Sequence, residues 1–239
     1  MKSFCSQLSK RGWYPPDETT LRDDISEYLS AVHHEPLHDI MAVILPHAGY
    51  RYSGPVAAHG LAHLLNTQYD RVIIIGPSHY YPLENSGSIL EVSHYETPLG
   101  TIALDTDVVE ALLQTPYFDS IYDVHAEEHS VQMEIPLIQY AMPDVPIVPI
   151  IIGHMSHQHC REMATCLRPH LTNNTLVVIS SDFTHFGASF QYTPFHNNIE
   201  NNIKQLDMAA VDHIINKDSA GFNRFLNDKQ PTICGRHPI

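Results

Sequence analysis

Short, continuous apolar runs separated by helix-length segments are the feature that most constrains the fold of this chain. The clearest runs, residues 145–152 and 176–179, are rich in β-branched side chains. Such runs are typical of parallel strands that are covered on both faces. Two similar runs, residues 41–45 and 72–75, are separated by one helix-length segment, as in a βαβ unit. Because strand and helix patterns alternate along the chain, the sequence predicts a three-layer α/β/α sandwich with a mostly parallel central sheet.

Helix signals fill most of the intervals between these runs. Leu21, Ile25 and Leu29 fall at helical spacing, and Asp17 can cap the start of that helix. Pro136 lies inside another helical pattern and should kink that helix or mark its first turn. No repeat or linker divides the chain, so one domain of residues 1–239 is expected. Further helices are predicted at residues 55–65, 105–114, 130–141, 155–169, 199–215 and 219–226, with shorter strands between residues 87 and 102 around a turn at 98–100.

The composition excludes several classes of protein. The formal net charge of −14 over 239 residues argues against a nucleic-acid or anionic-membrane partner, because either would need a basic face. No apolar run is long enough to span a bilayer, and the first residues lack the apolar segment of a signal peptide. The four cysteines lack the paired spacing of a disulfide framework. We therefore expect a cytoplasmic protein, and the sequence leaves its oligomeric state open.

Histidine is the compositional outlier, with 18 residues. His47 directly follows the run at 41–45, and His79 follows the run at 72–75. The carboxyl ends of parallel strands meet at one edge of a sheet, and neighbouring strands lie ~4.8 Å apart, so these two imidazoles could share one ion or one substrate. Most other histidines are expected at the surface, among them His33, His34, His38, His94, His170, His196 and His213.

Another strand end carries groups that can reach the same edge. Asp182 and His185, in the segment SSDFTHFG, follow the run at 176–179. His129 lies in the segment EEHS at the start of a predicted helix. Acidic residues there suit the positive end of the helix dipole, which is the favoured interpretation for Glu127. His129 is either an acid/base or supporting group of the site, or an ordinary helix-start residue.

A crowded segment, residues 154–160, has the composition of a zinc site but not its spacing. It holds three histidines and Cys160, whereas structural zinc sites commonly use two ligand pairs. A solvated helix start is the preferred interpretation. Tyr50 and Tyr52 are either hydrogen-bond donors to a substrate or wall residues. The glycine-rich nucleotide-binding patterns are missing from the sequence, so nucleotide binding is excluded.

Five sequence motifs occur along the chain in the order PHAGYRYSG, GPSHY, EEHSVQMEIP, SSDFTHFG and ICGRHPI. Together with the early segment GWYPPD they resemble the Memo family, known in bacteria and archaea as protein B of the AmmeMemoRadiSam system. The resemblance spans nearly the whole chain and implies a fold like that of the class III extradiol dioxygenases. Those enzymes bind non-haem iron(II) through two histidines and a carboxylate.

The resemblance also implies roles for the motif residues. His47 and His79 would be the two histidine ligands of a metal ion, and Cys234 would be the third protein ligand. A thiolate is softer than a carboxylate and suits iron(II) or copper, with zinc as a further candidate. An inert buried thiol is the alternative for Cys234. The residues implied to line the same pocket are His129, Asp182 and His185, with His185 as the acid/base by analogy with the dioxygenases.

Three functions are compatible with this pocket. The first is a metal-dependent oxidoreductase with dioxygenase-like activity on a small aromatic or quinoid molecule. The second, implied by animal family members that are associated with receptor tyrosine kinase signalling, is a non-enzymatic module that binds a phosphopeptide-type ligand with help from Arg236. The third is a zinc-dependent hydrolase in which His47, His79 and Asp182 bind the ion and activate water.

The end of the chain departs from the family pattern. Family members continue past CGRHPI through a further helix and closing strands, whereas this sequence ends at Ile239. The resemblance therefore predicts a truncated C-terminus and a sheet without its C-terminal strands. Either the protein is naturally short or its reading frame ends early. Cys234 would depend on this tail for its position.

Overall fold

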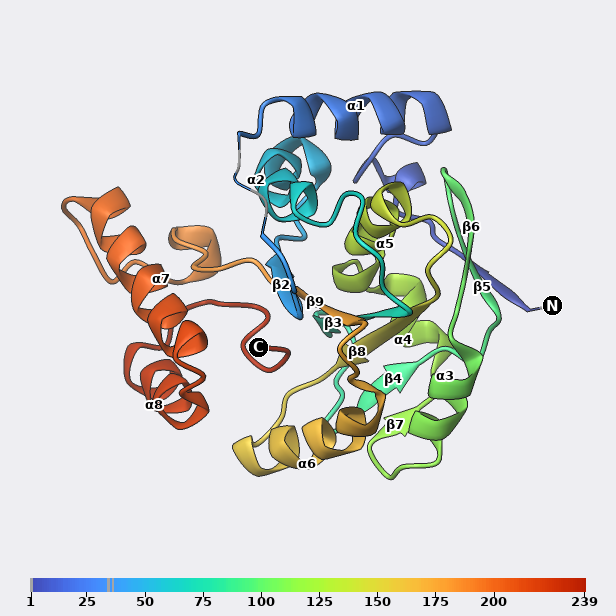
Figure 1. The fold of residues 1–239 in the computed structure, drawn as a ribbon. Helices are drawn as coiled ribbons and strands as arrows, with labels where there is room; N and C mark the ends of the chain where they lie inside the picture. The colour runs from blue at the N-terminus through green and yellow to red at the C-terminus, as the bar shows by residue number, and fades with distance from the viewer. Residues whose placement is uncertain (1, 34, 36) are drawn as a thin grey trace.

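A six-stranded sheet forms the centre of the structure, a computed structural model that describes residues 2–33, 35 and 37–239 (Figure 1). Neighbouring strands are parallel except for β4 and β8, which are antiparallel. The predicted mostly parallel sheet is confirmed. Across the sheet the strands follow the order β2 (Ala42–Leu45), β9 (Thr175–Ser180), β3 (Arg71–Pro77), β8 (Ile147–Ile152), β4 (Gly87–Ile89) and β7 (Phe118–Asp119).

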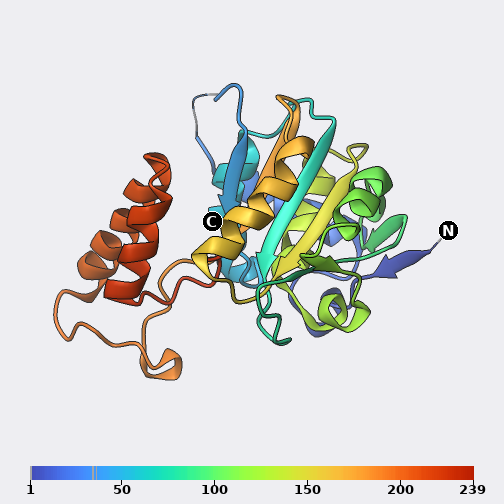
Figure 2. The same cartoon turned by 90° about the horizontal axis from the view of Figure 1, so that it is seen from below.

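Helices lie on both sides of this sheet. On one side are α1 (Glu18–Ser30), α2 (Tyr50–Ala62) and α5 (Ser130–Ala141), and α5 packs directly on β3, β8 and β9. On the opposite side, α6 (His157–Leu167) lies across the strands (Figure 2). Because both faces are covered, all six residues of β8 are buried, as its continuous apolar run predicted. The three-layer arrangement is therefore confirmed.

A second sheet has three strands, β1 (Ser3–Cys5), β5 (His94–Thr97) and β6 (Gly100–Ala103). β5 and β6 form the predicted hairpin, and Gly100 closes its turn at φ +106°, a conformation that favours glycine. β1 pairs in parallel with β5, and no local pattern predicted this strand.

The remaining helices are α3 (Thr106–Leu113), α4 (Tyr122–Glu127), α7 (Ile199–Ile215) and α8 (Ser219–Lys229), with 3-10 turns at Ser9–Arg11, Arg168–His170 and Ala188–Phe190. α7 and α8 pack against each other at the side of the sheet where β2 is the edge strand (Figures 1 and 2). Within the part of the chain that the structure describes, no helix has the length and apolar character needed to cross a membrane.

One helix, α2, begins earlier than predicted. α2 begins at Tyr50 rather than at residue 55, so Pro55 lies inside the helix instead of at its start. The prediction was wrong because proline commonly marks a first helical turn. As a result, only a short loop separates β2 from α2, and His47 lies in that loop. The helix predicted at residues 130–141 is confirmed as α5, and Pro136 lies inside it beyond the first turn.

Candidate metal centre

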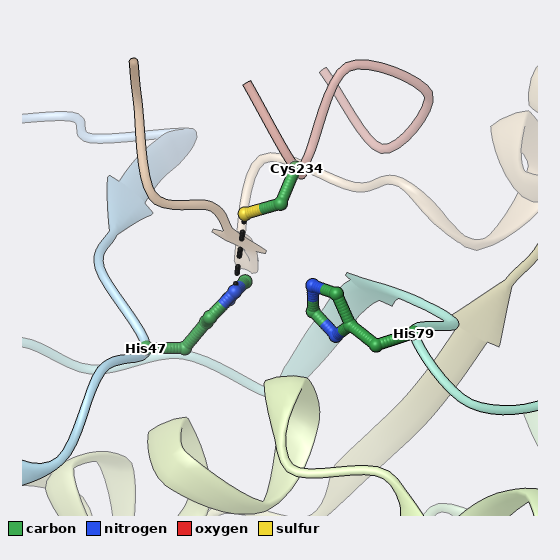
Figure 3. A group of neighbouring side chains, drawn as sticks. All are labelled: His47, His79 and Cys234. Carbon is green, nitrogen blue, oxygen red and sulfur yellow. Dashed lines mark hydrogen bonds between the residues drawn. The ribbon is translucent and has the colours of Figure 1, made fainter. Parts of the chain in front are cut away.

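His47, His79 and Cys234 lie together at the carboxyl edge of the sheet (Figure 3). Their ligand-type atoms are all within 4.8 Å of one another, and His47 Nε2 is 3.1 Å from Cys234 Sγ. His47 follows β2, His79 follows β3, and Cys234 belongs to the segment after α8. The fold therefore brings together the three residues for which the family resemblance implied a shared ion.

The two histidines do not follow neighbouring strands, and the sequence-based expectation on this point was wrong. β9 lies between β2 and β3 in the sheet. The two imidazole centroids are nevertheless 5.2 Å apart. Residues at the end of β9 consequently contact His47, whose backbone N–H donates to Asp182 Oδ1 at 3.0 Å.

Each of the two histidine rings has a polar partner at its Nδ1 atom. Ser180 Oγ lies 2.7 Å from His47 Nδ1, and Glu128 Oε1 lies 2.8 Å from His79 Nδ1. With both Nδ1 atoms engaged, the Nε2 atoms are the ones left to act as ligands. Metal-binding histidines are commonly fixed in this way, because a partner on the second ring nitrogen sets both tautomer and ring orientation.

Glu128 is a buried carboxylate, 1% exposed, that is surrounded by N–H donors. Its oxygens accept the backbone N–H groups of His79, of His129 at 2.8 Å and of Ser130 at 2.9 Å, in addition to contacting the His79 ring. His79, Glu128 and His129 also have metal-ligand spacing. A carboxylate has about four acceptor sites and these are occupied, so we interpret this second group as support for the first.

Burial and hydrogen bonding set the charges of the site. Burial acts to lower the pKa of His79, but hydrogen bonds to Cys234 and Glu128 raise it to about 9. Burial acts to raise the pKa of Glu128, but its hydrogen bonds and the attraction of His79 lower it to about 2. Burial lowers the pKa of His47 to about 3 and that of His129 to about 4. At neutral pH the site therefore contains one ion pair and two neutral rings.

Cys234 reaches the site because the tail packs closely on the residues that follow β9. Its sulfur accepts the backbone N–H of Asp182 at 3.1 Å, and the N–H of Gly235 donates to Ser181 Oγ at 3.0 Å. A Cβ at Gly235 would lie only 2.3 Å from Ser181 Cβ, so a residue with a side chain could not occupy this position without movement. The tail residues thus place the thiol beside His47.

His129 and Asp182 lie next to the cluster, and His185 lies beside Asp182. Asp182 Oδ2 is 3.8 Å from His185 Nε2, which is beyond hydrogen-bonding distance. The His129 ring stacks between the rings of His79 and Trp13, with centroid separations of 4.5 Å on each side. Trp13 is the only tryptophan of the chain. A row of rings therefore extends from the histidine cluster to Trp13.

Sequence analysis missed two supporting residues, Glu128 and Ser180. Glu128 was grouped with its neighbour Glu127, whose side chain is 63% exposed and pairs with Arg11 at 3.3 Å. Ser180 has no role in the sequence-based prediction, although it is fully buried in the structure. Polar residues directly beside a candidate ligand or strand-end motif were the only available signal for both.

Other candidates have structural roles away from the cluster. Tyr50 is buried and donates to the carbonyl of Met133 at 2.7 Å, so it is a wall residue, whereas Tyr52 is exposed on α2. In the crowded segment, Ser156 caps α6 by accepting the N–H of His159 at 3.2 Å, as expected for a helix start. Of the predicted surface histidines, His34 lies outside the described residues, His33, His38 and His196 are exposed, and His94, His170 and His213 are half-buried.

A cavity of about 510 Å³ lies on the α6 side of the sheet, where β3 and β8 form its floor and α6, α8 and the tail form its walls. Arg236 lines this cavity. The phosphopeptide hypothesis had assigned Arg236 to the histidine pocket. His47, His79 and Cys234 are not among the residues that line this cavity.

Known proteins match this chain along nearly its whole length. Residues 11–239 match a family described as Memo-like protein. Protein MEMO1 of Xenopus laevis is 34% identical over 248 aligned residues, which cover 100% of this chain and 83% of the relative. Protein MEMO1 of Homo sapiens is 31% identical over 245 residues, or 98% and 82%. Protein memo-1 homolog of Caenorhabditis elegans is 33% identical over 236 residues, or 95% and 67%. The chain belongs to the Memo family.

Proposed function

We propose that this protein is a metal-dependent oxidoreductase whose centre binds iron(II) or copper through His47, His79 and Cys234. The observation that carries the proposal is that a buried polar residue contacts the Nδ1 atom of each histidine ring. Ser180 and Glu128 engage the two Nδ1 atoms, so that the two Nε2 atoms are the ring nitrogens that face Cys234 Sγ.

The donor set fits such an ion. Two imidazoles and one thiolate suit iron, copper or zinc, and three protein ligands leave a coordination position open for a small molecule. Nitrogen and sulfur bound to one tetrahedral ion lie about 3.6 Å apart, given bond lengths of about 2.1 and 2.3 Å. The present separation of 3.1 Å between His47 Nε2 and Cys234 Sγ is a hydrogen bond. Binding would thus replace this hydrogen bond and widen the gap slightly.

When bound, iron(II) or copper would supply electron exchange with dioxygen or with a substrate at the open position. The surrounding residues would handle protons. His129 is neutral at neutral pH because burial lowers its pKa to about 4, so its ring can accept a hydrogen bond from a substrate hydroxyl. His185, whose Nε2 lies 3.8 Å from Asp182 Oδ2, is the acid/base candidate beside them. The rings of Trp13 and Tyr80, 4.5 and 5.8 Å from His129, would suit a planar aromatic or quinoid substrate.

Two other functions receive less support from the geometry. A zinc hydrolase that uses Asp182 as a ligand is disfavoured, because Asp182 Oδ1 already accepts the backbone N–H of His47. A phosphopeptide site in the histidine pocket with help from Arg236 is disfavoured, because Arg236 lines the cavity beside α6 and the three residues of the cluster do not.

Metal content and oxygen consumption together test the proposal. Protein prepared under reducing conditions should bind one iron or copper ion per chain, and binding should quench the fluorescence of Trp13. Iron(II)-loaded wild type should consume oxygen faster than His47→Ala. His94→Ala is a suitable control, because His94 lies on β5 in the other sheet. Equal oxygen consumption by wild type and His47→Ala would refute the proposal, and zinc with hydrolytic activity would favour the hydrolase.

A further inference from the structure

Ser180 forms a buried hydrogen-bond junction behind His47. Its Oγ lies 2.7 Å from His47 Nδ1, 2.8 Å from the carbonyl oxygen of Ser130 and 2.9 Å from Glu134 Oε1. Ser130, Ser180 and Glu134 are all 0% exposed, so bulk solvent does not reach these direct contacts. Every proton in the junction must therefore come from the four groups themselves.

Counting protons gives one consistent arrangement. Each of the three short contacts needs one hydrogen, and the Ser180 hydroxyl has only one. The Ser130 carbonyl cannot donate, so the hydroxyl hydrogen of Ser180 lies on that contact. The other two contacts must then be donated to Ser180 Oγ, one by His47 Nδ1 and one by Glu134.

The surroundings of Glu134 agree with a carboxyl group that carries a proton. Its Oε2 is buried without a hydrogen-bond partner, and an ionised carboxylate would be costly there. The titratable groups that act on it are Asp182 and Tyr50, and neither is a cation. Burial raises the pKa of Glu134 well above its ordinary value.

We propose that Ser180, with Glu134 behind it as a neutral carboxylic acid, is a positioning residue that fixes the tautomer of His47. The fixed tautomer carries its hydrogen on Nδ1 and leaves the lone pair of Nε2 directed toward Cys234. The benefit for metal binding rests on the proposed function, whereas the proton positions are properties of the metal-free protein. Experiments can therefore refute the proton positions and the effect on metal affinity independently of each other.

Infrared spectroscopy of the metal-free protein tests the protonation of Glu134. At neutral pH the wild type should show the carbonyl stretch of a protonated carboxylic acid, and the band should shift when glutamate is labelled with carbon-13. The band should be missing from Glu134→Gln, in which the side-chain amide can still donate to Ser180. A wild-type spectrum without this band would overturn the proposal, and this measurement needs no variant to fold.

Nitrogen-15 NMR of histidine-labelled, metal-free protein tests the tautomer. The His47 signal, identified by its loss in His47→Gln, should show a protonated Nδ1 in wild type and in Glu134→Gln. In Ser180→Ala the ring should populate both tautomers, and affinity for zinc as a probe should fall about 10- to 100-fold. Ser88→Ala is a matched control, because Ser88 is also 0% exposed on a strand but contacts Ile121 instead. An unchanged tautomer and affinity in Ser180→Ala would overturn the proposal.

Discussion

Two histidine-rich regions of the molecule contain the same ligand types in different surroundings. In the metal-centre group, His47, His79 and Cys234 come from three separate parts of the chain and lie within ligand distance of one another. In the crowded segment at residues 154–160, three histidines and a cysteine lie within seven sequence positions. Among the described residues, the groups with metal-ligand spacing do not include this segment.

The difference lies in what holds each ring. Buried partners engage the Nδ1 atoms of His47 and His79. In the crowded segment, by contrast, the His154 side chain is 72% exposed, and His157 Nε2 has no hydrogen-bond partner. His159 takes part in capping α6. A high density of ligand-type residues in the sequence therefore does not ensure that they converge in space, whereas the rings with buried partners do converge.

Removing ligands from each region should give the largest contrast. His47→Ala and Cys234→Ala should each abolish stoichiometric binding of iron or copper, because only two protein ligands remain. The double variant His157→Ala/Cys160→Ala should still bind one ion per chain. Equilibrium dialysis followed by elemental analysis measures both. If Cys234→Ala still bound one ion per chain, or if the α6 double variant bound none, the assignment of the ligands to the His47, His79 and Cys234 group would be wrong.

Raising the pH should strengthen metal binding at the centre. Below pH 9 the metal-free His79 is protonated, because its hydrogen bonds to Cys234 and Glu128 raise its pKa to about 9. This proton must leave before Nε2 can bind an ion, so affinity should rise about tenfold per pH unit for each proton released. Competition with a chelator, using zinc between pH 7 and 9, measures the slope. An affinity that is flat or falls over this range would contradict the assigned ion pair.

Adjacent glutamates offer a matched test of ring support. Glu128→Gln should weaken metal affinity about 10- to 100-fold, because the carboxylate that holds His79 Nδ1 is lost. Glu127→Gln should have little effect, because Glu127 is exposed and its ion pair with Arg11 lies at the surface. Calorimetric titration of both variants with the same ion compares them. Equal affinities would show that the buried partner does not matter.

Acid should destabilise the metal-free protein through the buried ring of His129. Burial lowers the pKa of folded His129 to about 4, whereas the unfolded ring has the ordinary value of 6.5. Between these pH values the unfolded chain binds more protons, so the stability of the metal-free protein falls as the pH falls. His129→Phe keeps the stacked ring but cannot titrate, and should lose about 2 kcal/mol less than wild type between pH 7 and 4.5. Urea unfolding at several pH values measures this, and an equal loss in wild type and His129→Phe would contradict the neutral, buried state of the His129 ring.

Much of the fold could be predicted, because the information was local. The apolar run at residues 145–152 predicted a strand covered on both faces, and β8 is such a strand. The order of strands was not local information. For this reason the sequence placed His47 and His79 on neighbouring strands, although β9 lies between them. β1 was missed because its pairing with β5 is formed only by the folded chain.

The candidate site was predictable to a different extent. Strand-end positions indicated His47 and His79, but Cys234 came only from the family motif, since nothing local connects the tail with the sheet. Glu128 and Ser180 could not be assigned, because a glutamate before a helix and a serine after a strand have common structural explanations. Their roles depend on which ring each one contacts, and this is fixed only by the packing of α5 on β3 and β9.

The separation of His47 and Cys234 along the chain has a consequence for unfolding. The two residues are 187 positions apart, and Cys234 lies in the segment after α8. An ion bound by both would act as a removable cross-link that closes a very long loop and joins the tail to the sheet. Loading and stripping the ion should therefore switch this part of the protein between a firmly attached and a loosely attached state, with metal supply controlling its lifetime in the folded form.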